Sequence, residues 1–289
     1  APVYGRINNG VAGGSFPADA YKVSTGGEGT IYGLTLPTDT YIDPVTDESI
    51  TAYEIDTEGT GDCPISVRHT DKAEAYLSTL YGRTALSKMP RGKEYVQAYD
   101  SALGYAFRYS GGSDFSMSYG ADYGFTSFFF TDNEGNVSES WMIYRAVYND
   151  HPGMFWWWID SFSAGSTGVS TNLAEDLSAS VYEDRKEAFE NASKEVLYDA
   201  AITDEMSDYD KAYSIYRVLI KKVRYDLNYI NQTAYAAMVD DTAVCAGYAK
   251  AYAYLLKKAG IEASYVAGSA VAGYAMQFLG NPYVYGGSS

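Results

Sequence analysis

The sequence contains few of the side chains that bind metals, form crosslinks or hold cofactors. Among its 289 residues are two cysteines and two histidines. So few cysteines in a chain this long exclude a disulfide scaffold, and a single Cys63–Cys245 bridge is the only crosslink the sequence permits. Zinc sites need several Cys or His ligands close together, and phosphate-binding loops and dinucleotide fingerprints are absent as well. We therefore expect neither a metal nor a cofactor.

Positive charge and long apolar runs are also scarce. The chain has 21 Lys and Arg against 37 Asp and Glu, a net charge of −16. Nucleic-acid phosphates and anionic lipids both attract cationic surfaces, so this charge argues against both as partners. The longest apolar run, Met154–Ile159, is far shorter than the ~18 residues that span a bilayer. We predict no nucleic-acid partner and no membrane insertion.

Tyrosine is the side chain present in excess, with 30 residues in a chain that is 46% hydrophobic and 20% charged. This balance is typical of a globular protein with a sizeable core. Tyrosine buries its ring and keeps its hydroxyl wet, which suits half-exposed sheets and polar interfaces. The scarcity of cysteine, the abundance of Tyr, Gly, Thr and Asp, and a first residue other than Met favour an exported bacterial protein, secreted or associated with the cell wall.

Residue patterns divide the chain into four segments. Residues 1–70 are rich in Gly, Thr, Asp and Pro, which predicts a β-leaning leader. Residues 71–180 alternate helical and β-like patterns and form a mixed lead-in domain. Residues 181–269 contain helices followed by a strand and form the candidate catalytic core. Residues 270–289 are an aromatic and glycine-rich tail. The fold class predicted is α+β.

Apolar periodicity places the individual elements. It predicts helices from Asp71 to Met89, Glu94–Arg108, Trp141–Tyr148, Arg185–Asp199 and Asp208–Asp226. The last helix has a continuous apolar stripe made of Tyr209, Ala212, Tyr213, Tyr216, Leu219 and Val223. Strands are predicted at Ala20–Val23, Thr30–Leu34, Phe115–Phe130, Phe155–Phe162 and Ile261–Val266.

The candidate catalytic residue is Cys245, which lies in the first turn of a further predicted helix. Asp241 or Thr242 is expected to cap this helix, and Gly260 to end it in a left-handed conformation. The positive end of a helix dipole favours a thiolate, the nucleophilic form of cysteine. The backbone N–H of Cys245 is a candidate oxyanion donor. The alternative is that Cys245 is a small buried core residue, as most lone cysteines are.

The two faces of this helix differ in polarity. Tyr248, Tyr252, Leu255 and Leu256 share one face and are expected to pack into the core. The three lysines at positions 250, 257 and 258 are expected to face water. The small residues near Cys245, Gly247 among them, allow other backbone to approach closely.

The sequence resembles the transglutaminase-like superfamily of bacterial secreted proteins. The resemblance covers roughly residues 140–268 and rests on 244–249, Leu255-Leu256, 259–261 and 265–268. It implies a papain-like core in which Cys245 attacks a peptide amide carbonyl. It also implies a downstream His and then an Asp that activate the cysteine.

The chain departs from this family pattern because no histidine follows Cys245. The expected His-Ala-Trp strand is absent after Gly268. His69 and His151 precede the cysteine, in the wrong order for this fold. We expect His151 to be a turn residue and His69 a surface or strand-end residue. Without an imidazole, acyl transfer lacks its general acid and base.

The tail resembles the opening of NlpC-like cell-wall endopeptidases. In those enzymes a helix and a Gly-x-Pro-Tyr-x-Tyr-Gly-Gly segment precede an Asp-Cys-Ser-Gly nucleophile, and Tyr274–Gly287 has this pattern without the nucleophile. We therefore expect the natural protein to continue past Ser289. The other explanation is that the transglutaminase-like part has decayed into a scaffold.

Three hypotheses for function follow. The first is an exported bacterial transglutaminase-like thiol enzyme that acts on peptide amides, cell-wall peptide in particular, with Cys245 as nucleophile and with catalysis incomplete in this chain. The second is a non-catalytic module that binds peptidoglycan and positions a downstream NlpC-like peptidase. The third is a fragment without activity of its own.

Overall fold

The computed structural model describes residues 22–24, 30–35, 40–43, 45–56, 66–107, 109, 111, 116–117, 139–157, 159–165, 168–173 and 177–265. Its helices are α1 (Asp71–Ser78), α2 (Tyr81–Ser87), α3 (Gly92–Phe107), α4 (Glu139–Asp150), α5 (Ala179–Asp199), α6 (Asp208–Lys222), α7 (Ala234–Met238) and α8 (Cys245–Lys258), with a 3₁₀ helix at Phe155–Trp157. Helices and small sheets occur together, so the predicted α+β class is confirmed.

The strands form small sheets rather than one large one. They are β1 (Lys22–Ser24), β2 (Thr30–Thr35), β3 (Thr40–Ile42), β4 (Ser49–Thr51), β5 (Tyr53–Asp56), β6 (Ser66–His69), β7 (Ser116–Met117), β8 (Ile159–Gly165), β9 (Gly168–Leu173), β10 (Arg224–Tyr225) and β11 (Thr242–Ala243). Consecutive strands β1–β2, β3–β4 and β5–β6 pair antiparallel, β9 lies between β7 and β8, and β10 pairs parallel with β11.

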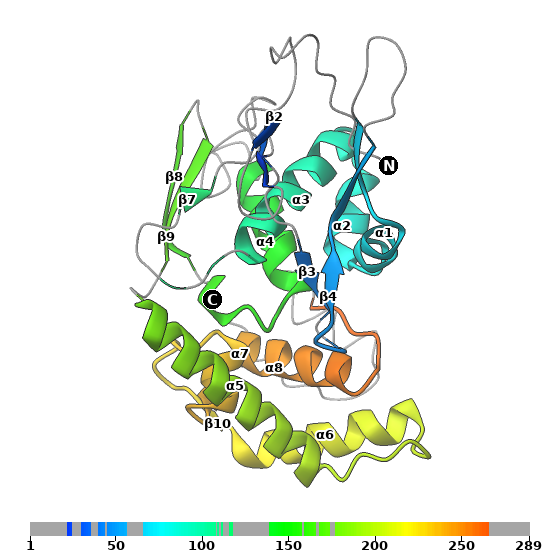
Figure 1. Ribbon diagram of the computed structural model, residues 1–289. Helices are drawn as coiled ribbons and strands as arrows, with labels where there is room; N and C mark the ends of the chain where they lie inside the picture. The colour runs from blue at the N-terminus through cyan, green and yellow to red at the C-terminus, as the bar shows by residue number, and fades with distance from the viewer. Residues whose placement is uncertain are drawn as a thin grey trace.

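Helices α1 to α4 gather in one part of the molecule and α5 to α8 in another (Figure 1). The first group encloses a tyrosine-rich core, in which Tyr41, Tyr99, Tyr144 and Tyr148 are almost completely buried. The second group has its own core, with Ile215, Leu219, Met238 and Leu255 at its centre. The hairpin of β3 and β4 extends from the first group toward the C-terminal end of α8.

The single helix predicted from Asp71 to Met89 begins where expected but is two helices, α1 and α2, which corrects the expectation. The chain leaves helical geometry at Leu80, whose φ and ψ of −80° and 114° are extended. The Asp150 carboxylate of α4 then accepts hydrogen bonds from the backbone N–H groups of Gly82 and Arg83, at 2.8 and 3.1 Å. A tertiary contact therefore starts α2 where the sequence has no capping residue of its own.

The apolar stripe predicted for α6 is divided: its Leu219 and Val223 are buried, while three of its tyrosines face outward. Tyr209, Tyr213 and Tyr216 are 75%, 50% and 46% exposed and stack on one another along the helix. The buried residues of α6 are Ile215 and Leu219. The tyrosine hydroxyl can hydrogen-bond to water, so tyrosine is less costly to expose than an aliphatic side chain. The two aliphatic side chains therefore occupy the face of α6 that packs into the core.

The remaining elements give mixed outcomes. The helices predicted at Glu94–Arg108, Trp141–Tyr148 and Arg185–Asp199 are confirmed as α3, α4 and α5, and the first two strands as β1 and β2. Helix α6 ends at Lys222 rather than at Asp226, because Val223 is extended and the chain enters β10. The buried strand predicted at Phe155–Phe162 begins as a 3₁₀ helix and becomes β8 only from Ile159.

The strand predicted after α8 is absent from residues 261–265, which are irregular. The rest of that expected strand, most of the β region predicted at Phe115–Phe130 and the whole tail 270–289 lie outside the described residues. Among the residues that are described, no helix has both the length and the hydrophobicity needed to cross a membrane. The four-segment division of the chain stays a prediction.

Candidate active site

Cys245 is the first residue of α8, and its thiol is free and exposed. The short parallel pair of β10 and β11 leads the chain to this point, with Tyr225 opposite Ala243. Because Cys245 is exposed at a helix start, the alternative interpretation, that it is a small buried core residue, is wrong. The predicted position at the positive end of the helix is confirmed.

The capping expected from Asp241 or Thr242 is not found, because Val244 is the N-cap and has no side-chain cap bond. Asp241 has a φ of 54°, in the left-handed region, and Thr242 lies in β11. A neighbouring loop supports the helix start instead: the Val244 N–H donates to the Asn231 carbonyl oxygen at 2.9 Å. The Asn231 side-chain amide donates to the Thr242 hydroxyl at 2.7 Å.

The loop that holds the helix start is organised by Asp226. Its carboxylate accepts hydrogen bonds from the backbone N–H groups of Asn228, Ile230 and Asn231, each at 2.9 Å. These bonds, that of Asn231 first, lower the pKa of Asp226 because they stabilise its ionised form. The Asp226 N–H also donates to the Ala243 carbonyl. One carboxylate therefore fixes the loop against β11, directly beside Cys245.

Two tyrosines flank the cysteine. Burial first, and then the electrostatic interaction with the neighbouring Cys245, raises the pKa of the Tyr225 hydroxyl. Burial also raises the pKa of Tyr265, and Cys245 adds to that rise. The Cys245 backbone N–H, predicted as an oxyanion donor, interacts with the Tyr225 hydroxyl. The Tyr225 side chain, 43% exposed, therefore occupies the N–H that an oxyanion would need.

Close backbone contact explains the glycine that follows Cys245 by two positions. A Cβ atom on Gly247 would lie 2.8 Å from the Ala243 Cβ, 2.9 Å from the Thr233 carbonyl oxygen and 3.0 Å from that of Asn231. Real Cβ atoms are rarely so close to such neighbours, so a larger residue would push the loop away. The prediction that small residues here admit other backbone is confirmed for Gly247.

The expected core face of α8 is confirmed, since Tyr248, Tyr252, Leu255 and Leu256 all contact the second core. Two of these tyrosines also tie α8 to α6. The Tyr248 hydroxyl donates to the Val223 carbonyl, and the Tyr252 hydroxyl donates to that of Ala212 at 3.0 Å. These two hydrogen bonds therefore fix the orientation of α8, the helix that carries the thiol, relative to α6.

The expectation that the lysines of α8 face water is wrong. Lys250 is 3% exposed and donates to the Gln232 carbonyl at 3.1 Å. Lys257 donates to the Asp150 carbonyl at 2.7 Å. Lys258 reaches the Asp47 carboxylate of the β3–β4 turn, also at 2.7 Å. Surrounding elements cover α8 on more sides than its own sequence pattern shows, and the long lysine side chains bridge to them.

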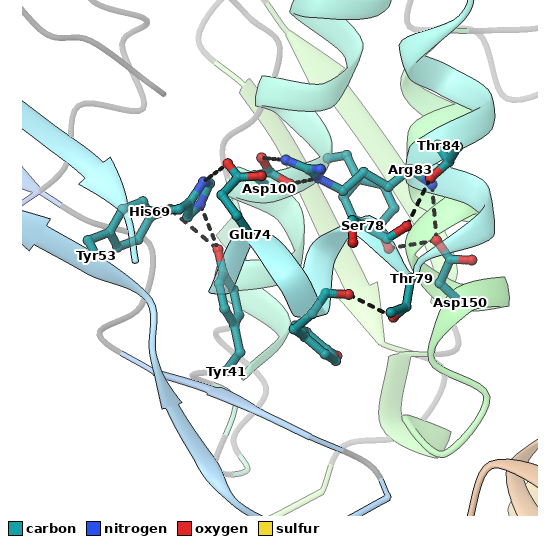
Figure 2. A network of polar contacts seen from close by, with 12 residues as sticks. Tyr41, Tyr53, His69, Glu74, Ser78, Thr79, Arg83, Thr84, Asp100 and Asp150 are labelled. Atoms are coloured by element: carbon teal, nitrogen blue, oxygen red, sulfur yellow. Dashed lines mark hydrogen bonds and ion pairs between the residues drawn. The ribbon is translucent and has the colours of Figure 1, made fainter. Parts of the chain in front are cut away.

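Neither histidine lies at Cys245. The His69 ring stacks on Tyr53, and its nitrogens lie 3.2 Å from the Tyr41 hydroxyl and 3.2 Å from a Glu74 oxygen (Figure 2). The hydrogen bond to His69 is the largest cause that lowers the pKa of Glu74 to about 2. His69 ends strand β6, as predicted, but it is buried rather than on the surface. It therefore belongs to a polar network in the first group of helices.

His151 lies at the wrong end of α8. It follows α4 at a turn, as predicted, and its neighbour Asp150 is bonded to Lys257. Lys257 is twelve residues beyond Cys245 on the same helix, about 18 Å along the axis at 1.5 Å per residue. Burial, and then the charge of Lys257, lowers the pKa of His151 well below its ordinary value. A neutral imidazole so placed cannot take the Cys245 proton.

The sequence argument missed Asp226 and Lys250 as parts of this site. Asp226 had a usable signal, because an Asp at the end of a strand with Asn two residues later is typical of a turn in which the side chain bonds the backbone. Lys250 had none, since its burial depends on Tyr148 of α4, distant in the sequence. The arrangement can supply a nucleophile and a structured helix start, while residues 246–289 contain no histidine.

Comparison with known families gives one match. A family model of the transglutaminase-like superfamily matches residues 197–279, which include Cys245 and the segments that support it. The α+β architecture agrees with the papain-like core that the sequence implied. No curated protein matches the chain.

Proposed function

We propose that Cys245 is the nucleophile of a transglutaminase-like thiol site that acts on peptide amides. The observation that carries this proposal is the exposed thiol at the first residue of α8, inside the segment that matches the superfamily. The start of a helix favours a thiolate, because the positive end of the helix dipole lies there. The loop around Asp226 keeps the helix start in place without covering the sulfur.

In the proposed reaction the Cys245 thiolate attacks the amide carbonyl carbon and forms a C–S bond. The C–N bond then breaks, and the departing nitrogen takes a proton from water and leaves as the amine. The resulting thioester passes its acyl group to water or to a second amine. The two histidines of the chain do not serve this proton transfer, because they lie in the first group of helices. Catalysis by these residues alone is therefore incomplete.

We extend the proposal to an exported bacterial protein whose substrate is cell-wall peptide. Its support is the acidic, cysteine-poor and tyrosine-rich composition together with the NlpC-like pattern of the tail. A second function, a non-catalytic module that binds peptidoglycan, is favoured by one observation. The imidazole expected of a complete catalytic site is missing from residues 246–289.

Alkylation tests the nucleophile. Iodoacetamide should label Cys245 faster at neutral pH than it labels N-acetylcysteine, because the start of a helix favours the nucleophilic form of a thiol. Peptide mass spectrometry distinguishes this label from one on Cys63, and Cys63→Ser is the matched control that leaves the Cys245 rate unchanged. A Cys245 rate no higher than that of N-acetylcysteine would contradict the proposal.

A peptidoglycan pull-down separates the two functions. An enzyme that lacks its general acid and base should still release amines or shortened peptides from purified peptidoglycan slowly, and Cys245→Ala should abolish this slow release. Retention on peptidoglycan without any release, unaffected by Cys245→Ala, would instead support the binding module.

A further inference from the structure

A buried lysine lies between elements that meet at the candidate active site. The Lys250 ammonium is 4.0 Å from the centroid of the Tyr148 ring and 5.3 Å from that of Tyr265. It also donates to the Gln232 carbonyl at 3.1 Å. Two ring faces and a carbonyl oxygen all attract a cation, so these three groups form a cage for the charged form of the side chain.

Each wall of the cage comes from a different part of the chain. Tyr148 is on α4 in the first group of helices and is 1% exposed. Gln232 follows Asn231, whose carbonyl supports the start of α8. Tyr265 follows α8 and is one of the two tyrosines that flank Cys245. Lys250 itself lies on α8, so its side chain connects the helix that carries the nucleophile to the three segments that contain Tyr148, Gln232 and Tyr265.

Burial opposes the positive charge that these three groups attract. Burial first, and then repulsion by Arg145 of α4, lowers the pKa of Lys250 from 10.5 to about 7. Arg145, Tyr148 and Tyr265 are titratable or charged groups that act on this position. The pKa values of both tyrosines are raised, so their rings stay neutral and lysine is the group that changes charge.

We propose that Lys250 is a positioning residue of the Cys245 site: its ammonium form holds the Gln232 loop and Tyr265 around the start of α8, and loss of its proton releases them. This inference rests on the proposed role of Cys245 as nucleophile. A neutral amine keeps no cation–π attraction to the two rings and is a weaker donor to the carbonyl. The surroundings of the thiol therefore change near neutral pH, although no residue that contacts the substrate changes.

Two variants separate the charge of Lys250 from its size. Lys250→Arg keeps a cation at every pH, and Lys250→Met keeps the length without a charge. The iodoacetamide rate constant of Cys245 is measured for wild type and both variants from about pH 6 to about pH 8.5, either side of the lysine transition. Wild type should match Lys250→Arg at the low end and Lys250→Met at the high end. The two variants should differ from each other by at least about threefold throughout.

Lys221→Met is the matched control, because Lys221 is an exposed lysine at the end of α6. Its rate should equal that of wild type at every pH. A ratio of wild type to either Lys250 variant that does not change with pH would overturn the proposal. Should Lys250→Met fail to fold, the ratio of wild type to Lys250→Arg alone decides the question.

The same experiment keeps this proposal distinct from the proposed function. If Cys245 reacts no faster than N-acetylcysteine in all variants, the nucleophile proposal fails, while the pH-dependent ratio can still be measured. Near-ultraviolet circular dichroism gives a second readout of the tyrosine cage. Wild type should show a transition near the pKa of Lys250 that both Lys250 variants lack, and a transition shared by all three proteins would contradict the role of Lys250.

Discussion

Replacing Lys250 with methionine is expected to change how the stability of the protein depends on pH. The folded state lowers the pKa of Lys250 from 10.5 to about 7, mainly through burial. That fall corresponds to about 5 kcal/mol of unfavourable free energy for the protonated lysine in the folded protein. The penalty is present in full below the folded pKa, where both states carry the proton. It decreases as pH rises toward the unfolded value, because the unfolded chain then binds more protons than the folded one.

The measurable quantity is the difference in unfolding free energy between wild type and Lys250→Met. From about pH 6 to about pH 9 this difference should shift in favour of wild type by about 2.5 kcal/mol, with most of the change above pH 7. Methionine has a similar length and no charge, so its variant lacks this pH-dependent contribution. Ionisation of the other buried groups affects both proteins equally and cancels in the difference.

Urea unfolding at a series of pH values measures the effect. Tryptophan fluorescence and far-ultraviolet circular dichroism are the two probes that monitor the unfolding. Lys221→Met, which removes an exposed lysine, should run parallel to wild type. Parallel curves for wild type and Lys250→Met would refute the reasoning, because they would mean that Lys250 carries no shifted pKa in the folded protein. Coincidence of the two optical probes checks that unfolding is two-state, which the free energies require.

Two further predictions concern the support of the helix start. Gly247→Ala should lower the unfolding free energy by about 1–3 kcal/mol, because its new Cβ would lie only 2.9 and 3.0 Å from the carbonyl oxygens of Thr233 and Asn231. Differential scanning calorimetry measures this as a lower Tm. An unchanged Tm would show that the loop can shift away from the new Cβ without loss of stability. Asp226→Asn should slow alkylation of Cys245 at neutral pH, since an amide cannot accept all three backbone hydrogen bonds. Because the pKa of Asp226 is lowered, its contribution to stability should be present above the ordinary carboxyl pKa and be lost as pH falls through its lower folded value, so wild type and variant should converge in acid.

The local features of the site were predictable because they depend on neighbours in the sequence. The apolar spacing after Cys245 predicted α8 and its core face, and Gly260 predicted its end, where the structure has a φ of 78°. Each signal acts over one or two helical turns. The resemblance in residues 244–268 added the identity of the nucleophile, which the spacing alone left open between an active thiol and a core residue.

Features that depend on distant contacts were predicted wrongly or missed. The break between α1 and α2 follows from the Asp150 carboxylate, which comes from another helix. The buried face of α6 is set by the helices packed against it, so Ile215 and Leu219 are inside and Tyr213 is outside. The start of α8 is held by the Asn231 carbonyl, which accepts the Val244 N–H, and the sequence signals for helix capping do not include a contact of this kind.

By itself, the sequence determined the α+β class, the helix that presents Cys245 and the absence of a histidine after it, because composition and short-range periodicity fix these. Only the tertiary structure decided that the thiol is exposed, that both histidines lie elsewhere and that Lys250 is enclosed by Tyr148 and Tyr265. The physical reason is that hydrophobic and electrostatic environments come from whichever segments meet in space. The polarity of a side chain on its own helix does not reveal whether a partner from elsewhere in the chain will cover it.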